Sequence, residues 1–473
     1  MWQWARLFGQ APFALGRGAS WACRCAGPVA GARARTLGAL IDVRPAVQVP
    51  GGAGGPDRRC ACAPPLPRPS RPWEAYSLAI VLLCAPATVA VLYNFHRQTA
   101  EDTNPRVFTK TDRVVTQLDV ILVMLSGNVA VLQALLYRRQ SHVFMEQQST
   151  VDRLLQARPP GVQLYLLLWL SAVSLLSALD ILYVYATGGP FVALCHVPNQ
   201  ANYLLIYTME ALFAEDVHCI FRRFKTLNDR LKSSCLAAAR RFPLELRPGL
   251  TLVAETPWKF GTADPSWPSS SGTGTGSGSG GGRSGRTRRA QELDGVPVHQ
   301  LEDAHALLCS SALNVVSRYG PVLLIDVLNL LMHFVTTSYF FLSVLVLDVK
   351  LQWYHFESYV TLQSLWMLAH LSRLVLLVLP CSCVKEEANK TGALVGTFLN
   401  TLHPSSYSRR QLEMFSMQLM HQRVTFSPCG LFELDLSLVV TLLGAVTTYL
   451  VVLMQIKVPP SSDIYLNTTN RSD

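Results

Sequence analysis

The strongest constraint on this chain is a series of apolar stretches, each about as long as a helix that crosses a membrane. A spanning helix needs roughly 20 mostly apolar residues. Charged residues make up 15% of the 473 residues, whereas soluble proteins contain roughly 25%. We therefore predict an all-α membrane protein with seven transmembrane helices. The predicted spans are Tyr76–Phe95, Val114–Tyr137, Val162–Tyr185, Phe191–Phe213, Tyr319–Leu347, Tyr359–Leu379 and Leu436–Ile456.

The N-terminal segment differs from the rest in composition. It is rich in Arg, Ala, Gly and Pro, and through residue 72 its only acids are Asp42 and Asp57. Organellar transit peptides share this Arg-rich, acid-poor pattern. We interpret residues 1–74 as a disordered basic tail in the cytosol.

The long segment between the fourth and fifth spans is the second region of unusual composition. Residues 225–300 are expected to form a flexible cytosolic loop around a Gly/Ser linker at 269–282. Helical patterns at its two ends predict that the neighbouring spans continue into the cytosol. Gly276, Gly278 and Gly281 match G-x-G-x-x-G, but no strand precedes them, so we expect neither a dinucleotide site nor any other cofactor.

Basic residues indicate which way the chain crosses the membrane. One side of the membrane has the N-terminus, the loop between the second and third spans, the long loop, and the loop between the sixth and seventh spans. This side holds 33 of the 41 Lys and Arg residues, whereas the opposite side holds 7. Positive charge favours the cytosolic side. The N-terminus is therefore predicted inside and the tail 458–473 outside, in a plasma-membrane protein. Asn467 and Asn470 are glycosylation acceptors in that tail. Orientation in lipid also explains the net charge of +10, so no nucleic-acid partner is expected.

The last span carries the motif that points to a family. It reads GAVTTYLVVLMQI, with Thr448 and Tyr449 followed by five apolar residues, Gln455 and Ile456. This ending resembles that of insect gustatory receptors, in which Phe usually stands where Ile456 does. The segments VDRLL, IFRRFKTLNDRL and FELDLSLVVTLLGAVTTY are also similar to that family. The resemblance covers roughly residues 75–457.

The resemblance implies a ligand-gated, non-selective cation channel for taste. Residues 75–457 would form the seven-helix channel domain, assembled as a homo- or hetero-tetramer whose seventh helices line a central pore. The ligand would be a small tastant, either a sugar such as fructose or a bitter compound. The classical sweet-receptor branch has Glu where Leu450 stands, which argues against that branch but not against a fructose-type receptor.

Helical spacing nominates pore residues in the seventh span. Gly444, Thr448, Val451 and Gln455 fall on one stripe of a helix. Lining a pore would satisfy the polar members of the stripe, although tight helix packing also favours small and polar residues. Gln455 and Ile456 are the gate candidates. Tyr449 lies about 100° from the stripe and is expected to pack against a neighbouring helix and hydrogen-bond there.

Polar and aromatic residues near the predicted outer ends of three spans nominate a ligand site. Aromatic faces with hydroxyl, amide and carboxylate groups suit a polyol, although Trp and Tyr also gather at membrane interfaces without a ligand. The Gln363-Ser-Leu-Trp366 and Thr337-Ser338-Tyr339 patterns look similar to those of the fructose-sensing branch. The predicted ligand residues are Asp180, Tyr183, Thr337, Tyr339, Gln363 and Trp366.

Two charges inside the spans require partners. Asp326 and Arg373 each lie about seven residues from the cytosolic end of their span, at similar depth by a rise of ~1.5 Å per residue. Because an unpaired charge at that depth costs several kcal/mol, we predict that they form an ion pair.

Other classes of protein fit the sequence less well. A G-protein-coupled receptor has the reverse orientation, and a transporter would show repeated halves and broken helices. No H-E-x-x-H, nucleophile elbow or cluster of metal ligands occurs in the sequence, so we predict neither an enzyme nor a metal site. Beyond the tastant and other receptor subunits, the expected partner is membrane lipid.

Overall fold

The computed structural model describes most of the predicted membrane domain. The described residues are 13–14, 68–69, isolated positions between 75 and 97, 110–157, 163–241, 297–346, 353–401 and 407–457. Within them the chain is helical, apart from connecting residues and a pair of two-residue strands. These strands, β1 (Phe13–Ala14) and β2 (Arg68–Pro69), pair in antiparallel fashion.

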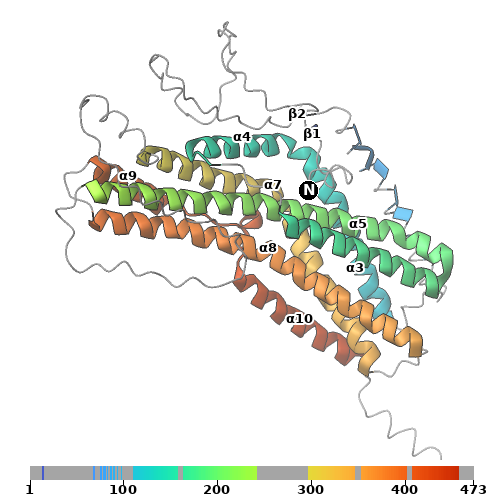
Figure 1. The fold of residues 1–473 in the computed structure, drawn as a ribbon. Coiled ribbons are helices and arrows are strands. Elements are labelled where there is room, and N and C mark those ends of the chain that lie inside the picture. The colour runs from blue at the N-terminus through green and yellow to red at the C-terminus, as the bar shows by residue number, and fades with distance from the viewer. Residues whose placement is uncertain are drawn as a thin grey trace, which may run out of the picture.

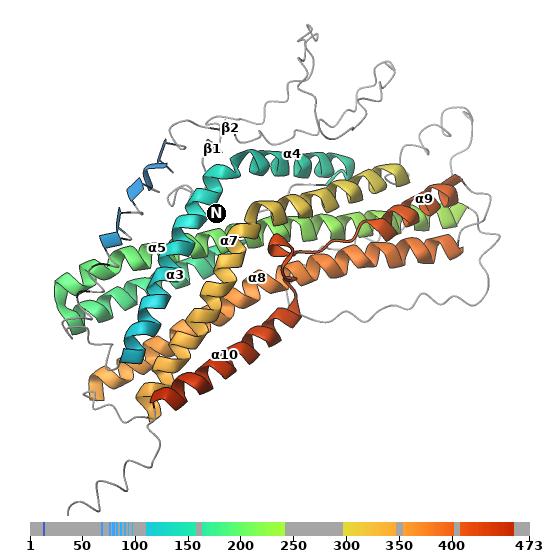
Figure 2. The same cartoon turned by 180° about the vertical axis from the view of Figure 1, so that it is seen from behind.

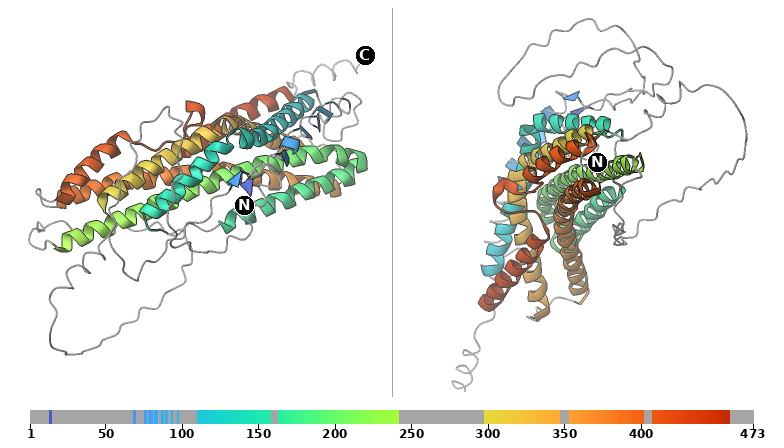
Figure 3. Two further views of the ribbon diagram at one scale, coloured as in Figure 1. Left: turned by 90° about the horizontal axis from the view of Figure 1, so that it is seen from above. Right: turned by 90° about the vertical axis from the view of Figure 1, so that its left-hand side faces the viewer.

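The helices form one elongated bundle (Figure 1), and Figure 3 shows the same bundle from above and from one end. Three helices are much longer than a membrane requires and run along most of the molecule. The elements are α3 (Lys110–Leu136), α4 (Arg138–Leu154), α5 (Leu164–Arg241), α7 (Val298–Val346), α8 (Trp353–Thr401), α9 (Tyr407–His421), the short 3-10 turn η1 (Pro428–Gly430) and α10 (Leu436–Lys457).

Element α5 is a hairpin of two antiparallel arms. Gly189 has φ +80° and ψ 176°, a conformation that glycine adopts without the steric cost of a side chain, and Pro190 follows it. Side chains on the two sides of this point contact each other across the hairpin: His196 contacts Asp180, and Trp169 contacts Tyr207. Figure 1 shows the chain doubling back here. Element α5 therefore contains both the third and the fourth predicted spans.

The predicted spans agree with the described helices. Five helices in the described part of the chain are long and apolar enough to cross a membrane: α3, α5, α7, α8 and α10. The second predicted span lies in α3, the fifth in α7, the sixth in α8 and the seventh in α10. The first, Tyr76–Phe95, lies mostly outside the described residues. Pro198 does not break α5, and the Asn202 side-chain amide donates to its carbonyl oxygen at 2.9 Å.

Helices also occupy segments that the sequence analysis treated as loops. Element α5 continues to Arg241, in line with the helical pattern at the start of the long loop, although residues 225–241 were counted within the flexible segment. Residues 242–296, which include the Gly/Ser linker, lie outside the described residues. Elements α4 and α9 were not predicted. Element α4 packs on α7, and α9 packs on α8 and α7, at one end of the bundle (Figure 1).

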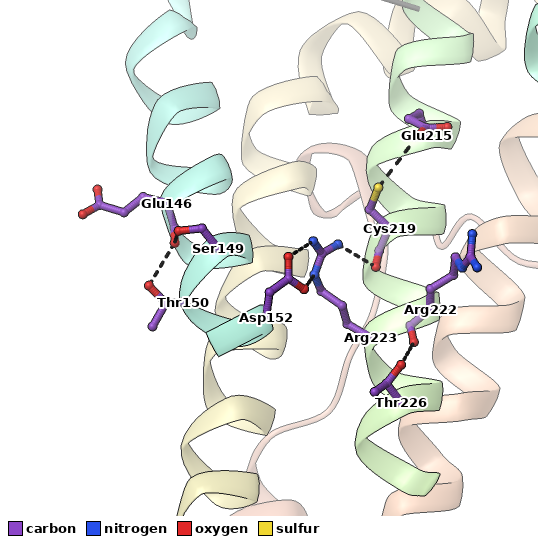
Figure 4. A network of polar contacts seen from close by, with 9 residues as sticks. All are labelled: Glu146, Ser149, Thr150, Asp152, Glu215, Cys219, Arg222, Arg223 and Thr226. Carbon is purple, nitrogen blue, oxygen red and sulfur yellow. Dashed lines mark hydrogen bonds and ion pairs between the residues drawn. The ribbon is translucent and has the colours of Figure 1, made fainter. Parts of the chain in front are cut away.

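A two-pronged ion pair fastens α4 to α5 at that end. Arg223 donates from Nε and Nη2 to the two carboxylate oxygens of Asp152, at 2.8 and 2.7 Å (Figure 4). Its Nη1 donates to the Cys219 carbonyl at 3.1 Å. Such bidentate pairs fix geometry as well as adding energy. The pair explains how a polar helix such as α4 holds its place.

The largest hydrophobic core runs along the second arm of α5 and along α7 and α8. It takes in Phe144 of α4, Phe415 of α9 and, at the base of α10, Leu438 and Leu442. Element α10 itself lies along the edge of the bundle beside α7 (Figure 2). Within one chain, 17% of its most apolar stretch is buried, compared with 67% for α7. Most of α10 is therefore uncovered by the described part of its own chain.

Close packing of α3 on α5 depends on Gly127. A Cβ atom at this position would lie 2.2 Å from Asn202 Oδ1 and 2.9 Å from Asn202 Cβ. We expect Gly127→Ala to destabilise the protein by about 1–3 kcal/mol, the usual cost of overpacking. Gly396→Ala in α8 is the control, because a Cβ atom there meets nothing within 4 Å and alanine favours helix. Thermal unfolding of the two purified variants checks this. Equal melting temperatures would contradict it.

Candidate functional site

The hairpin of α5 sets the depth of the functional side chains. Its second arm lies between α3, the first arm, α7 and α8, and nearly all its residues from Asn199 to Glu210 are buried. Near the predicted outer end, Asp180 Oδ2 accepts hydrogen bonds from Gln200 Nε2 at 2.5 Å and lies 2.6 Å from His196 Nε2. Asp180 is 4% exposed. A predicted ligand residue therefore belongs to a polar group that joins the two arms.

A cluster of stacked rings lies one level deeper; we call it the aromatic cluster. Tyr203 lies 5.1 Å from His333 and 5.3 Å from Trp366 between ring centroids. His370 closes the cluster, at 4.7 Å from His333 with parallel rings and at 5.8 Å from Trp366. The second arm of α5, α7 and α8 each contribute, so the cluster forms only in the folded bundle. Trp366 was predicted, but the other three residues were not.

Three buried polar atoms in or beside the aromatic cluster have no hydrogen-bond partner in the described structure. Asp119 Oδ1 of α3 lies 2.8 Å from His333 Nδ1. His333 Nε2 and His370 Nδ1 are buried and have no hydrogen-bond partner among the described residues, and the same holds for the Thr336 hydroxyl oxygen one turn away on α7. Buried polar groups usually find partners. The cluster thus combines ring faces with unused donors and acceptors, which is the chemistry that binds a small polar molecule.

The remaining predicted ligand residues are divided. Tyr183 lies 6.3 Å from Tyr359 between ring centroids, at the outer rim, and Gln363 is half-buried one turn above Trp366. Thr337 is buried one turn from His333. Tyr339 is fully buried but lies about 120° around α7 from His333, by the helical repeat. Tyr339 therefore lies on a different face of α7 from His333, and the assignment of the six residues to a ligand site stays a prediction.

Below the aromatic cluster lies a charged triad of Glu210, Asp326 and Arg373. Arg373 Nη2 donates to Asp326 Oδ1 at 2.9 Å, so the two residues expected to pair are in contact. The sequence analysis missed a third partner: Arg373 Nε donates to Glu210 Oε1 at 2.8 Å. All three side chains are completely buried. The guanidinium carbon also lies 4.9 Å above the centre of the Tyr207 ring.

The pore stripe of α10 faces away from its own chain. Leu438, Leu442 and Val446 pack into the core, whereas Gly444, Thr448, Val451 and Gln455 are exposed on the opposite side of the helix. The Ile456 backbone is helical, but its side chain lies outside the described set. Tyr449 is 57% exposed, so the described part of this chain does not supply the packing partner expected for it.

A polar contact joins the sixth span to the start of the seventh. Lys385 Nζ of α8 lies 2.6 Å from Glu433 Oε2 and 3.7 Å from Asp435 Oδ2, just before α10. Hydrogen bonds from Ser437 keep the pKa of Asp435 below its usual range. The helix that carries Trp366 is therefore tied to the helix that carries the stripe.

Other predicted sites fall outside this framework. Asn467 and Asn470 lie outside the described residues. Over the described ranges, no group of three His, Cys, Asp or Glu side chains is arranged to hold a metal ion.

A sequence signal existed for the missed residues. His333 lies seven residues after Asp326, and His370 lies three before Arg373. At 3.6 residues per turn, each falls on the same face as the predicted ion-pair partner. Examining the residues on those two helix faces, toward the outer ends of the spans, would have identified both histidines.

Comparison with known proteins agrees with this architecture. The model of a family described as 7tm Chemosensory receptor matches residues 68–458. The gustatory receptor for sugar taste 43a of Drosophila melanogaster is 24% identical over 78% of this chain and 88% of its own length. Putative gustatory receptor 28b of the same fly is 29% identical over 33% of this chain and 34% of its own length. The structure of olfactory receptor OR5 from the insect Machilis hrabei matches with a TM-score of 0.52 and 11% identity, over 82% of this chain and 90% of that one, which is a likeness of fold.

Proposed function

Because this chain belongs to the 7tm chemosensory receptor family, we propose that it is a taste receptor that works as a ligand-gated, non-selective cation channel. Membership places it among insect gustatory receptors, which are chemoreceptors and not enzymes. In the proposed arrangement it lies in the plasma membrane, with its N-terminus in the cytosol and its C-terminus outside. Four subunits, identical or mixed, surround one pore.

The exposed stripe of α10 is the observation that carries the channel proposal. A highly apolar helix that is mostly uncovered by its own chain requires other cover, which lipid or neighbouring subunits supply. Lipid does not suit the Gln455 amide, because polar groups facing hydrocarbon are costly; the Thr448 hydroxyl already donates to the Gly444 carbonyl oxygen at 3.0 Å. Around a central axis, the stripe would face water while its flanks contact the next subunit. Gating at the Gln455–Ile456 end by dewetting needs only a ring of apolar side chains.

The aromatic cluster supports a small polar tastant, with a sugar such as fructose as the best candidate. Ring faces stack on C–H surfaces, while the buried imidazole nitrogens and hydroxyls orient the hydroxyls of the ligand. The similar fly protein is described as a receptor for sugar taste. A bitter compound of similar size is the alternative, since aromatic walls also suit flatter, less polar molecules. The contact between Lys385 and Glu433 offers a path from α8 to α10.

Thiol labelling of α10 tests the channel proposal. Thr448→Cys places a thiol on the stripe, and Val446→Cys places one on the face that packs against the same chain, where Val446 is 8% exposed. We expect a charged thiol reagent applied outside to remove most of the ligand-evoked current of Thr448→Cys and to leave Val446→Cys and the unsubstituted receptor unchanged. A G-protein inhibitor in the pipette should change nothing. Equal block of both variants, or of neither, would count against a pore lined by this stripe.

A further inference from the structure

The charged triad holds more negative than positive charge. Arg373 supplies one cation, whereas Glu210 and Asp326 supply two carboxyl groups, and all three side chains are inaccessible to solvent. Burying one uncompensated charge in a bundle of membrane helices costs several kcal/mol. Two ionised carboxylates beside one guanidinium would leave such a charge. Either a further cation or a proton must therefore accompany the triad.

The positions of the two carboxyl groups indicate where that positive charge lies. Arg373 contacts Glu210 Oε1 and Asp326 Oδ1. Arg373 Nη2 lies 2.8 Å from Glu210 Oε1 and 2.9 Å from Asp326 Oδ1, so the two carboxyl groups meet at one nitrogen. Glu210 Oε2 and Asp326 Oδ2 have no donor among the described residues. Two carboxylates held against one nitrogen repel each other, and paired carboxyl groups relieve this repulsion by sharing one proton.

Neighbouring groups also lack partners. The Tyr207 hydroxyl, one turn before Glu210, and both polar atoms of Asn329, one turn after Asp326, are buried without a hydrogen bond in the described structure. The charged or titratable groups that face the triad from the packed helices are Asp119 of α3, Tyr203 and Tyr207 of α5, His333 of α7 and His370 of α8. Of these, Asp119 Oδ1 lies 2.8 Å from His333 Nδ1. None supplies a cation that contacts both carboxyl groups.

We propose that Glu210 and Asp326 bind one proton between them, so that the triad is a neutral, proton-binding site inside the receptor. The site joins three helices: Glu210 comes from the second arm of α5, Asp326 from α7 and Arg373 from α8. Loss of the proton places two carboxylates side by side and pushes α5 from α7. This proposal does not depend on what the ligand is or on whether the chain conducts ions.

Infrared spectroscopy of the full-length receptor in lipid nanodiscs tests the proposal. A protonated carboxyl group has a carbonyl stretch that carboxylates lack, and its position shifts in heavy water. We expect this band at neutral pH, and we expect its loss in Glu210→Gln and in Asp326→Asn, because either amide replaces the shared proton with a permanent N–H donor. Glu433→Gln is the control, since Glu433 is solvent-exposed in its contact with Lys385.

Stability against pH provides the second readout. The unsubstituted receptor should melt at a lower temperature as the pH rises from neutral to strongly alkaline, because the proton is lost. Glu210→Gln should show a smaller alkaline drop than the unsubstituted protein. A missing band in the unsubstituted receptor, or a band that persists in both amide variants, would overturn the proposal. So would an alkaline drop of equal size with and without Glu210.

Discussion

Replacing Arg373 with methionine is expected to remove most of the receptor from the cell surface. Methionine fills much of the space of the arginine side chain, so the change removes a charge without opening a large cavity. It leaves Glu210 and Asp326 completely buried and without the cation that each of them contacts. Removing one partner of a buried ion pair costs about 3–5 kcal/mol, which is a large part of the 5–15 kcal/mol that stabilises a typical domain.

Surface biotinylation, scaled to total protein, measures this effect. Arg222→Met is the matched control, because Arg222 is exposed on the same arm of α5 that carries Glu210. Asp326→Asn should be far milder than Arg373→Met, since Glu210 still pairs with the arginine at 2.8 Å. For the same reason, the double variant Asp326→Ala/Arg373→Ala should recover only part of the surface signal. Full recovery in that double variant would show that Glu210 is not a true partner.

The sequence predicted the membrane architecture because length and hydropathy determine it. An apolar stretch of spanning length is stable as a helix across the hydrocarbon core of a bilayer. The break at Gly189 and Pro190 separates two such stretches inside α5. Elements α4 and α9 were missed for the opposite reason. Their sequences are polar on average, and their helices are held by packing on α7 and α8 and by contacts such as Asp152 with Arg223. Hydropathy does not report tertiary contacts of that kind.

The candidate site was predictable in depth but not in rotation. Counting residues from the span ends placed Asp180, Thr337 and Trp366 at similar levels, and it placed Asp326 beside Arg373. The rotation of each helix about its own axis is decided by packing against its neighbours, which the sequence of that helix does not show. The sequence therefore did not show that Tyr339 lies on a different face of α7 from His333. Glu210 was missed as a partner of Arg373, because nothing in the sequence shows that the second arm of α5 is surrounded by other helices.

Replacing Trp366 with alanine is expected to abolish the sugar response at ordinary concentrations. The Trp366 ring lies 5.3 Å from Tyr203 and 5.8 Å from His370, so its loss removes one wall of the aromatic cluster. An aromatic side chain at the centre of a binding site commonly contributes about 2 kcal/mol or more. At ~1.4 kcal/mol per tenfold change, the half-maximal sugar concentration should rise by more than an order of magnitude. Whole-cell current with fructose, other sugars and bitter compounds measures the shift.

Control variants distinguish the loss of a side chain from the ligand site from a general destabilisation of the helix bundle. Leu368→Ala, two residues along α8, removes a side chain that is 62% exposed and should leave the response unchanged. Trp366→Phe keeps a ring and should recover part of the sensitivity at equal surface level. If fructose acts equally on Trp366→Ala and the unsubstituted receptor, the aromatic cluster is not the sugar site. A different outcome is that bitter compounds alone open the channel and Trp366→Ala loses that response; in that outcome the cluster remains the site and the ligand is a flatter molecule. The ring faces of Tyr203, His333 and His370 would then contribute more to recognition than their polar atoms.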